Sequence, residues 1–238
     1  SGNEELGRAV YVMNVLMRWR GTDKITSHLD IGSSTGALLA AMMDRFLVEK
    51  SVGVEPNNAW RTFSVNSFQK YMDTAQESVK NAHPRNFHVY ENLKEVPKTP
   101  KFDLVTCIHT LEHIVEIGDI IKGASTRMKP NGYLMIAVPY LFGGFADPLM
   151  FPHLHVFTAK TLTNALELNG MAVELFETGH TAAPFWMPPN DMMVIAKKAG
   201  ASQEMTKTRL LEVYQQTAEV NRNVKESQRK MPVTYSMG

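Results

Sequence analysis

Up to Pro139, short apolar runs alternate along the chain with longer segments in which apolar residues recur every three or four positions. A continuous apolar run is typical of a strand covered on both faces, and the wider spacing is typical of an amphipathic helix. The pattern predicts strands at 25–31, 52–55, 87–90, 102–108 and 133–138, and helices at 4–20, 35–47, 115–128 and, with mixed character, 57–82. Strands and helices in this alternation predict an α/β fold with a largely parallel sheet.

The pattern changes after Pro139. Residues 139–157 combine prolines, glycines and histidines, which predicts an insertion or lid. A helix at 158–169 follows, and Thr158 is a suitable N-cap because its hydroxyl can accept a backbone N–H of the first turn. Two further strands, at 172–176 and 192–196, are predicted to form a hairpin across a proline-rich connection.

The C-terminal segment has a different character from the core. Between residues 203 and 230, apolar side chains recur at alternating spacings of three and four, a heptad-like stripe within a charged sequence. This helix is expected either to pair with a second copy in a homo-oligomer or to fold back over its own core. We therefore divide the chain into an N-terminal helix or lid (1–24), a main domain (25–200) and a C-terminal helix and tail (201–238).

Composition narrows the class of protein. The 238 residues carry 25 basic and 24 acidic side chains, a formal net charge of +1. Nucleic-acid and membrane-surface binders usually carry a basic excess, so the balance disfavours a nucleic-acid partner. The single cysteine, Cys107, excludes an intramolecular disulfide and fits a reducing compartment. With no apolar run long enough for a membrane span, the sequence predicts a cytoplasmic protein.

The sharpest local signal is the turn Leu29–Gly36, Leu-Asp-Ile-Gly-Ser-Ser-Thr-Gly, which leaves a predicted strand and opens a predicted helix. Small residues allow close approach of a ligand, and a helix N-terminus offers free backbone N–H groups. About twenty residues later, Glu55 ends the next strand, where a carboxylate can accept hydrogen bonds from a ribose diol. Together these features predict a nucleotide-type cofactor site.

This turn resembles the first motif of the class I S-adenosylmethionine-dependent methyltransferases, Asp-x-Gly-x-Gly-x-Gly, with Ser34 in place of the middle glycine. Serine fits such a turn if its φ stays negative. Four later segments are similar to further motifs of the family: Gly53–Pro56, Phe102–Val105, Leu111–Ile114 and Met128–Leu134. The resemblance covers roughly residues 25–198 and implies a Rossmann-like sheet of seven strands with the last strand antiparallel, here with N- and C-terminal helical additions.

The resemblance also implies roles for individual residues. The methionine half of S-adenosylmethionine would be surrounded by the turn, Glu55 would hold the ribose, Pro56 would pack near the adenine, and Asn92 would accept the adenine amino group. His109 and Thr110, after the fourth strand, would contact the methionine end. The expected cofactor-binding residues are Asp30, Gly32, Ser33, Ser34, Gly36, Glu55, Pro56, Asn92, His109 and Thr110.

Histidines gather near the expected cofactor mouth. His109, Glu112 and His113 would project from one face of a helix that begins there, and His153 and His155 would share one side of an extended segment. The pattern His-x-x-Glu-His resembles the Glu-x-x-Glu-His metal site of small-RNA 2′-O-methyltransferases and ubiquinone-pathway O-methyltransferases. It implies a divalent metal held by His109, Glu112, His113 and His155, which would help to deprotonate a substrate hydroxyl.

A second resemblance competes with the metal. Residues 152–158 are similar to a His-x-His-x-Phe-Thr signature of bacterial methyltransferases that act on sugars, where a histidine serves as general base or substrate contact. His155 is the leading candidate base, with His153 and His113 as further catalytic candidates, because imidazole can accept a proton near pH 7.

These resemblances lead to an O-methyltransferase that acts on a small molecule such as a sugar or sugar nucleotide. The first alternative is a metal-dependent RNA 2′-O-methyltransferase, which the near-neutral charge disfavours. The second is a non-catalytic, cofactor-binding subunit that works through its C-terminal helix, which the histidines of the cleft disfavour.

Overall fold

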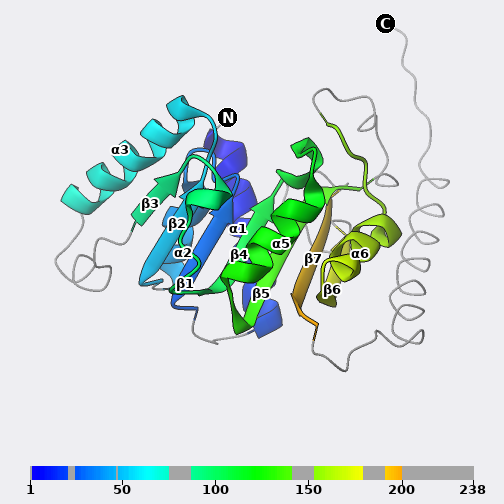
Figure 1. Ribbon diagram of the computed structural model, residues 1–238. Coiled ribbons are helices and arrows are strands. Elements are labelled where there is room, and N and C mark those ends of the chain that lie inside the picture. Colours follow the sequence, from blue (N-terminus) through cyan, green and yellow to red (C-terminus); the bar gives the residue numbers. More distant parts are fainter. Residues whose placement is uncertain are drawn as a thin grey trace, which may run out of the picture.

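The computed structural model describes residues 2–20, 25–46, 48–74, 87–140, 153–178 and 191–199. Helices and strands alternate from one end of this part to the other, as the apolar pattern predicts (Figure 1). The elements are α1 (Gly2–Arg20), β1 (Ser27–Ile31), α2 (Ala37–Phe46), β2 (Lys50–Val54), α3 (Asn58–Thr74), β3 (Phe87–Tyr90), η1 (Leu93–Glu95), β4 (Phe102–Ile108), η2 (Leu111–His113), α5 (Ile117–Arg127), β5 (Met128–Pro139), α6 (Ala159–Leu168), β6 (Met171–Thr178) and β7 (Asp191–Lys198).

The strands form one seven-stranded sheet in the order β3-β2-β1-β4-β5-β7-β6. The first five strands are parallel, and β7 lies antiparallel between β5 and β6. The expected sheet of seven strands with an antiparallel final strand is therefore confirmed. The order reverses between β1 and β4, and ligands of open α/β sheets bind at the carboxyl ends of the strands beside such a reversal.

Apolar side chains cover both faces of the sheet. One cluster joins α1 and α2 to inward-facing residues of β4, β5 and β7, and Trp19 of α1 meets Tyr133 edge-on with ring centroids 4.5 Å apart. The second cluster joins α5 and α6 to the opposite face, and Figure 1 shows these two helices in front of the sheet. Strands buried on both sides explain the continuous apolar runs in the sequence.

Several boundaries differ from the prediction. The helix expected at 115–128 begins at Ile117, and the turn expected at 129–132 lies inside β5. There the register of β5 against β4 shifts between Phe102 and Leu104, and Gly132 lies so close to the Phe102 carbonyl that a Cβ would approach its oxygen to 2.8 Å. Glycine is needed at that close approach. The C-terminal helix expected at 203–230 and most of the predicted lid lie outside the described residues.

The start of α6 agrees with the sequence. The Thr158 hydroxyl accepts the Thr161 N–H at 3.1 Å, and the Thr161 hydroxyl accepts the Thr158 N–H in return. Caps of this type stabilise a helix by about 1 kcal/mol. Immediately before it, Phe157 forms an isolated parallel bridge with Tyr140, so the chain comes back to the edge that it left at the end of β5.

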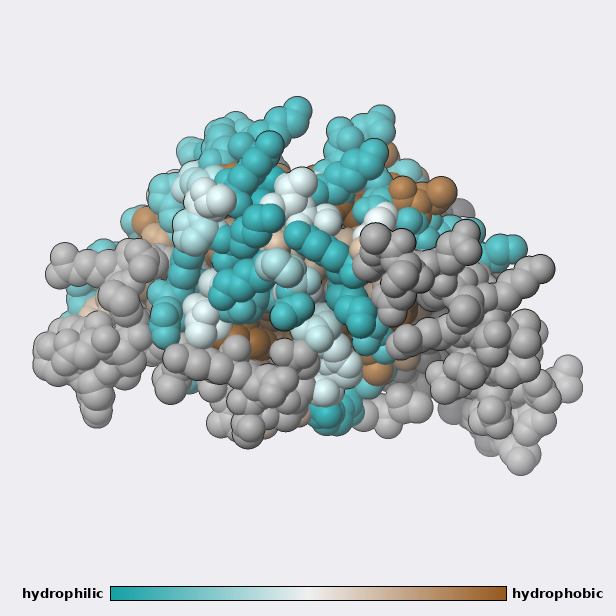
Figure 2. Space-filling view, turned by 60° about the horizontal axis from the view of Figure 1, so that its bottom comes forward, coloured by the Kyte–Doolittle hydropathy of each residue, from teal (hydrophilic) through white to brown (hydrophobic). Residues whose placement is uncertain are grey.

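No helix in the part of the chain that the structure describes is both long enough and apolar enough to cross a membrane. Figure 2 shows one side of the molecule on which hydrophilic residues cover most of the described surface and apolar residues occur in separate small areas. Scattered apolar side chains are usual on protein surfaces.

Candidate functional site

The Gly-rich turn follows β1 and makes three left-handed steps. Gly32 and Gly36 both have a φ of 80°, and Ser34 has a φ of 47°. The expectation of a negative φ at Ser34 is therefore wrong, because the tight return of the chain into α2 requires a left-handed residue at that position. A residue with a side chain pays about 1 kcal/mol or more there relative to glycine. Thr110 packs against Gly32 where any Cβ would collide with its side chain.

Several backbone donors of the turn are bonded within the protein, and free N–H groups at the start of α2 stay a prediction. Gly32 and Ser33 both donate to the Val54 carbonyl, at 2.8 and 3.0 Å, and Ser34 donates to the Glu55 carboxylate at 2.9 Å. The other Glu55 oxygen accepts the Asn57 N–H at 2.8 Å. Glu55 thus fixes the turn against the end of β2, and a carboxylate keeps further lone pairs for a ligand.

A pocket opens above this turn, and it brings together the first two predicted regions of the chain. Its lining includes the expected cofactor residues Asp30, Gly32, Ser33 and Ser34. Arg8, Ala9 and Val12 of α1 also line it, together with Ala37, Leu38 and Ile108. Sequence reasoning placed α1 near the cleft but did not single out Arg8, which has no motif around it.

Asp30 is the acidic residue among those that line this pocket. It is 3% exposed, and burial raises the pKa of its carboxyl to about 7, with a smaller rise from Glu55 and an opposing effect of the hydrogen bond from Thr106. The Thr106 hydroxyl donates to Asp30 Oδ1 at 2.6 Å. A buried carboxylate of this kind gains most from a cationic ligand.

His28 contacts the same threonine from the next inward-facing position of β1. It is fully buried, and its Nε2 lies 2.8 Å from the Thr106 hydroxyl. Burial lowers the pKa of His28 to about 3, so the ring is neutral. The spacing of His28 and Asp30, two apart on one strand, was the signal that could have linked them.

The other expected cofactor residues around the turn are Pro56, Asn92 and Gly36. Pro56 is exposed beside Glu55, where a planar ring could pack. The Asn92 carbonyl oxygen accepts the Glu95 N–H at 3.3 Å and so caps η1, with its amide nitrogen on the Glu95 carboxylate. Adenine recognition by Asn92 stays a prediction. Gly36 opens α2, and its N–H is bonded to the Ser33 carbonyl.

His109 has a different environment from the one expected. Its φ is 48°, so no helix begins there, and the chain passes through the short η2 turn before α5. Its Nε2 lies 2.8 Å from Asp191 Oδ2, and its Nδ1 lies 3.5 Å from Glu112 Oε1. Burial alone would lower the pKa of His109, but the hydrogen bonds to the two carboxylates outweigh it and raise the pKa to about 9.

Asp191 is the residue that sequence reasoning missed. It begins β7 opposite Pro139, is 3% exposed, and reaches His109 across β5. Because β7 follows 82 residues after His109 and Asp191 belongs to no motif, only the three-dimensional sheet order reveals the pair. Both ring nitrogens of His109 therefore face carboxylates.

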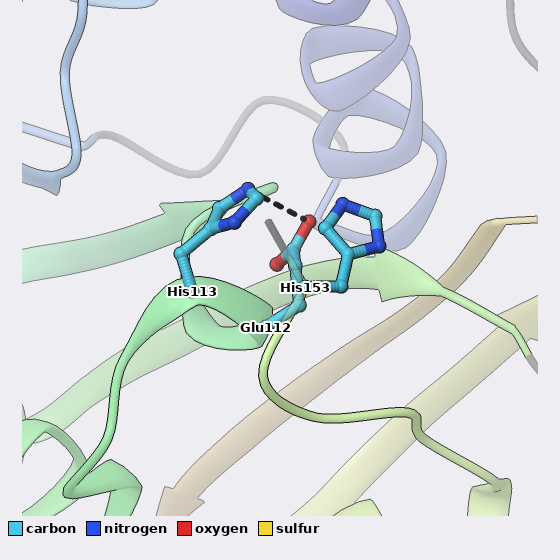
Figure 3. Close-up of side chains that lie close together, drawn as sticks. All are labelled: Glu112, His113 and His153. Carbon is cyan, nitrogen blue, oxygen red and sulfur yellow. Dashed lines mark ion pairs between the residues drawn. The ribbon is translucent and has the colours of Figure 1, made fainter. Parts of the chain in front are cut away.

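Glu112, His113 and His153 form the closest metal-ligand set among the described residues. One ligand atom from each lies within 4.8 Å of the others, and Figure 3 shows the Glu112 carboxylate between the two imidazole rings. Glu112 Oε1 lies 3.9 Å from His113 Nε2, and the two rings meet with centroids 4.8 Å apart. The set differs from the predicted one, since His153 takes the place of His155 and His109 lies outside it.

The backbone explains how His153 reaches this position. The N–H groups of Leu154 and His155 both donate to the Glu112 carbonyl, at 2.8 and 3.1 Å, which fixes this segment against η2. His155 Nε2 is buried and has no hydrogen-bond partner among the described residues. Its ring lies 6.0 Å from that of Phe157. His155 is thus next to the acid and histidine group without belonging to it.

Comparison with known proteins agrees with this geometry. A family model described as a methyltransferase domain matches residues 12–175. Ubiquinone biosynthesis O-methyltransferases from Acinetobacter baylyi and Bradyrhizobium diazoefficiens are 29% and 26% identical over 111 and 109 residues, 46% of this chain in each case. The matched regions cover 42% and 38% of those proteins, less than half of their length.

Solved structures resemble the chain at the level of the fold. An S-adenosylmethionine-dependent methyltransferase from Clostridium acetobutylicum has a TM-score of 0.60 at 10% identity, covering 82% of this chain and 92% of that one. Magnesium protoporphyrin IX methyltransferase from Synechocystis, with S-adenosylhomocysteine bound, has a TM-score of 0.58 at 13% identity, covering 82% and 84%.

Proposed function

The chain belongs to the methyltransferase-domain family and is an S-adenosylmethionine-dependent methyltransferase; on that premise we propose that it methylates an oxygen of a small molecule. The proposal is carried by one observation, the Glu112, His113 and His153 group, whose first two residues follow shortly after β4, the strand whose Ile108 lines the cofactor-type pocket. Such a group suits deprotonation of a hydroxyl, which an oxygen acceptor requires before or during methyl transfer.

The pocket charges fit the amino-acid end of the cofactor. Asp30 is suited to the ammonium group, and Arg8, which lines the same pocket, is suited to the carboxylate. Glu55 and Pro56 are the residues to which the resemblance assigns the ribose and the adenine. S-adenosylmethionine, when bound, supplies a methyl group on a sulfonium, and the residues of the chain bind and orient it.

A divalent metal fits the acceptor side. Glu112 is 1% exposed, its Oε1 faces His109 Nδ1 at 3.5 Å and His113 Nε2 at 3.9 Å, and its Oε2 has no hydrogen-bond partner among the described residues. A buried carboxylate beside two imidazoles is a donor set that divalent transition metals prefer. Glu112, His113 and His153 would hold the ion, which when bound would lower the pKa of a substrate hydroxyl. Asp191 and His109 hold Glu112 from behind.

His155 is the proposed general base. Its buried Nε2 has an unused lone pair or proton among the described residues, and its backbone is fixed on the Glu112 carbonyl beside the proposed metal ligands. A neutral imidazole at this place can accept the proton of an acceptor hydroxyl. His153 and His113 are then metal ligands first, and act as bases only if no metal is used.

The acceptor class follows from charge and from the relatives. A net charge of +1 gives little attraction for a polyanion such as RNA. The relatives named as ubiquinone biosynthesis O-methyltransferases support oxygen as the methylated atom. A sugar or sugar nucleotide, expected from the His-x-His-x-Phe-Thr segment, is the first acceptor to test, and hydroxylated aromatic compounds are the second.

The test is a methyl-transfer assay with labelled S-adenosylmethionine against sugar nucleotides, phenols and a short RNA, with and without a chelator. We expect a labelled, base-resistant ether product from a small molecule and a large loss of turnover on chelation. Labelled RNA, or labelled nitrogen as the acceptor atom, would contradict the proposal. Turnover that is insensitive to chelator would remove the metal and leave His155 as the base.

A further inference from the structure

The deepest polar side chains of the cofactor side are those of His28, Thr106 and Asp30. The exposed fractions of these residues are 0%, 0% and 3%. His28 and Asp30 lie two apart on β1, and Thr106 is the direct neighbour of Asp30 on β4. The alternation of side chains along a strand therefore puts all three on one face of the sheet, the face that α1 and α2 cover.

The hydrogen bonds among them have a defined direction. An ionised Asp30 can only accept, so the single hydroxyl proton of Thr106 is donated to Asp30 Oδ1 at 2.6 Å in preference to the Leu29 carbonyl at 3.5 Å. The Thr106 oxygen can then only accept from His28 Nε2, which lies 2.8 Å away. The network thus fixes the His28 tautomer with its proton on Nε2 and leaves Nδ1 without a hydrogen-bond partner among the described residues.

We infer that His28 and Thr106 are positioning residues that hold the Asp30 carboxylate toward the ammonium group of the cofactor. The inference rests on the proposed place of the methionine half beside Asp30. A hydrogen-bond chain that ends on one carboxylate oxygen polarises along its length and leaves the other oxygen for the ligand. A buried carboxylate without this support would take up a proton more readily and would attract a cation less strongly.

The surroundings of Asp30 leave the orientation of its carboxylate to the hydrogen bonds from Thr106 and His28. Glu55 and the buried Cys107 thiol lie near it and offer no positive charge, and Arg8, which lines the same pocket, is not among the groups that shift the pKa of Asp30. Arg8 would attract the carboxylate of the ligand and not its ammonium. Among the described residues, the Thr106 hydroxyl is the donor that the structure gives to the Asp30 side chain.

A pair of ligands separates this role from general stability. S-adenosylhomocysteine carries the amino-acid end, and 5′-methylthioadenosine lacks it but keeps the adenosine and the sulfur. Calorimetric titration of the full chain with both ligands measures the contribution of the amino-acid end alone. The variants are Thr106→Val and His28→Phe, which remove the donors at similar volume, and Thr106→Ser and His28→Gln, which keep a donor.

Thr106→Val is expected to weaken S-adenosylhomocysteine roughly tenfold, as for loss of a hydrogen bond to a charged group. His28→Phe is expected to weaken it a few-fold, because its effect passes through Thr106. Affinity for methylthioadenosine should stay within twofold in both, and Thr106→Ser and His28→Gln should recover most of the loss. Thr163→Val, a buried threonine on α6, is the matched control without effect on either ligand.

Equal losses for both ligands, or none for either, would overturn the inference. If Thr106→Val does not fold, the comparison of His28→Phe with His28→Gln decides it in the same way. Asp30→Asn tests the proposed place of the methionine half separately from the positioning role of His28 and Thr106. Should Asp30→Asn weaken both ligands equally, the proposed place of the methionine half is wrong; should it be selective while the His28 and Thr106 variants are not, only the positioning role fails.

Discussion

The turn at Asp30–Gly36 and the region at 109–113 and 153–155 lie at the same edge of the sheet but are built differently. The turn is local in sequence, and the backbone N–H groups of Gly32, Ser33, Ser34 and Gly36 are bonded to Val54, Glu55 or the turn itself. The second region draws on separate segments and keeps buried polar atoms without hydrogen-bond partners among the described residues, namely Glu112 Oε2 and His155 Nε2.

The difference indicates a division of tasks. The backbone N–H groups described for the turn are bonded before any ligand arrives, which suits a preformed template for the proposed cofactor, although the buried Ser33 hydroxyl has no hydrogen-bond partner among the described residues. A region that keeps unsatisfied buried acceptors is destabilised by them, since each costs about 1–3 kcal/mol, and such groups are retained where a ligand or ion satisfies them. Variants in the second region should therefore change turnover, and variants in the first should change cofactor affinity.

The largest effect is expected from Glu112→Gln. The amide keeps the shape of the side chain but removes the charge that faces His109 and His113, so the proposed metal loses its anionic ligand. We expect roughly a 100-fold loss of turnover in a methyl-transfer assay, since metal sites contribute several kcal/mol of stabilisation to the transition state. Affinity for S-adenosylhomocysteine should change less than twofold.

Glu116→Gln, an exposed carboxyl before α5, is the control and should leave turnover unchanged. A parallel loss of cofactor affinity in Glu112→Gln would show that the two regions are not separate.

Arg8→Gln tests the opposite side of the comparison. Loss of its charge from the wall of the pocket should weaken S-adenosylhomocysteine roughly tenfold, as for a hydrogen bond to a charged group, and leave methylthioadenosine unaffected. Calorimetry measures both. Arg18 lies on the same helix as Arg8 and forms an exposed 2.9 Å ion pair with Glu177 of β6. Arg18→Gln breaks only that pair and should bind both ligands normally. Unchanged binding in Arg8→Gln would leave the ligand carboxylate without its proposed partner.

The pH dependence of cofactor affinity should report Asp30. Its pKa is about 7 in the ligand-free protein, and a cationic ligand favours the ionised form, so binding below pH 7 must expel a proton. The dissociation constant of S-adenosylhomocysteine should therefore rise by up to about tenfold per unit as pH falls below 7, and level off above it. Asp30→Asn should flatten the profile.

The Asp30 carboxyl has the opposite pH dependence in folding: it weakens cofactor binding at low pH but stabilises the folded state there. Because its pKa rises from 3.8 to about 7 on folding, the folded state binds more protons than the unfolded state in that interval. The contribution of Asp30 to the free energy of unfolding should thus be greatest below pH 4 and be lost as pH rises to 7. Asp30→Asn should remove this dependence in chemical-denaturation curves, and an unchanged dependence would assign it to another group.

The smallest effect is expected from Ser34→Gly. Glycine relieves the left-handed strain at a φ of 47° but adds chain entropy to the unfolded state, so a net rise of about 0.5 kcal/mol in the free energy of unfolding is expected. Ser33→Gly, at a neighbour without positive φ, should lower it. Lower stability in Ser34→Gly would mean that the serine side chain contributes a contact worth more than the strain.

The contrast between the regions also explains what the sequence could predict. The turn, Glu55 and the seven strands follow from local patterns, because hydrophobic spacing and small residues act over a few positions. His109 was misplaced because the prediction assumed a helix where the chain makes a left-handed step, and Asp191 was missed because its partner is 82 residues away. The choice between His153 and His155 depended on how an extended segment docks on the Glu112 carbonyl, which no local pattern encodes.

The bridge between Tyr140 and Phe157 has a consequence for how this protein could be re-engineered or diversified. Because Tyr140 and Phe157 are paired, the chain before and after residues 141–156 lies side by side. A change of length between two such neighbouring positions costs a modest closure entropy and leaves the strand order on either side intact. Under the proposed function, exchange of that stretch is expected to change acceptor preference without altering the cofactor turn.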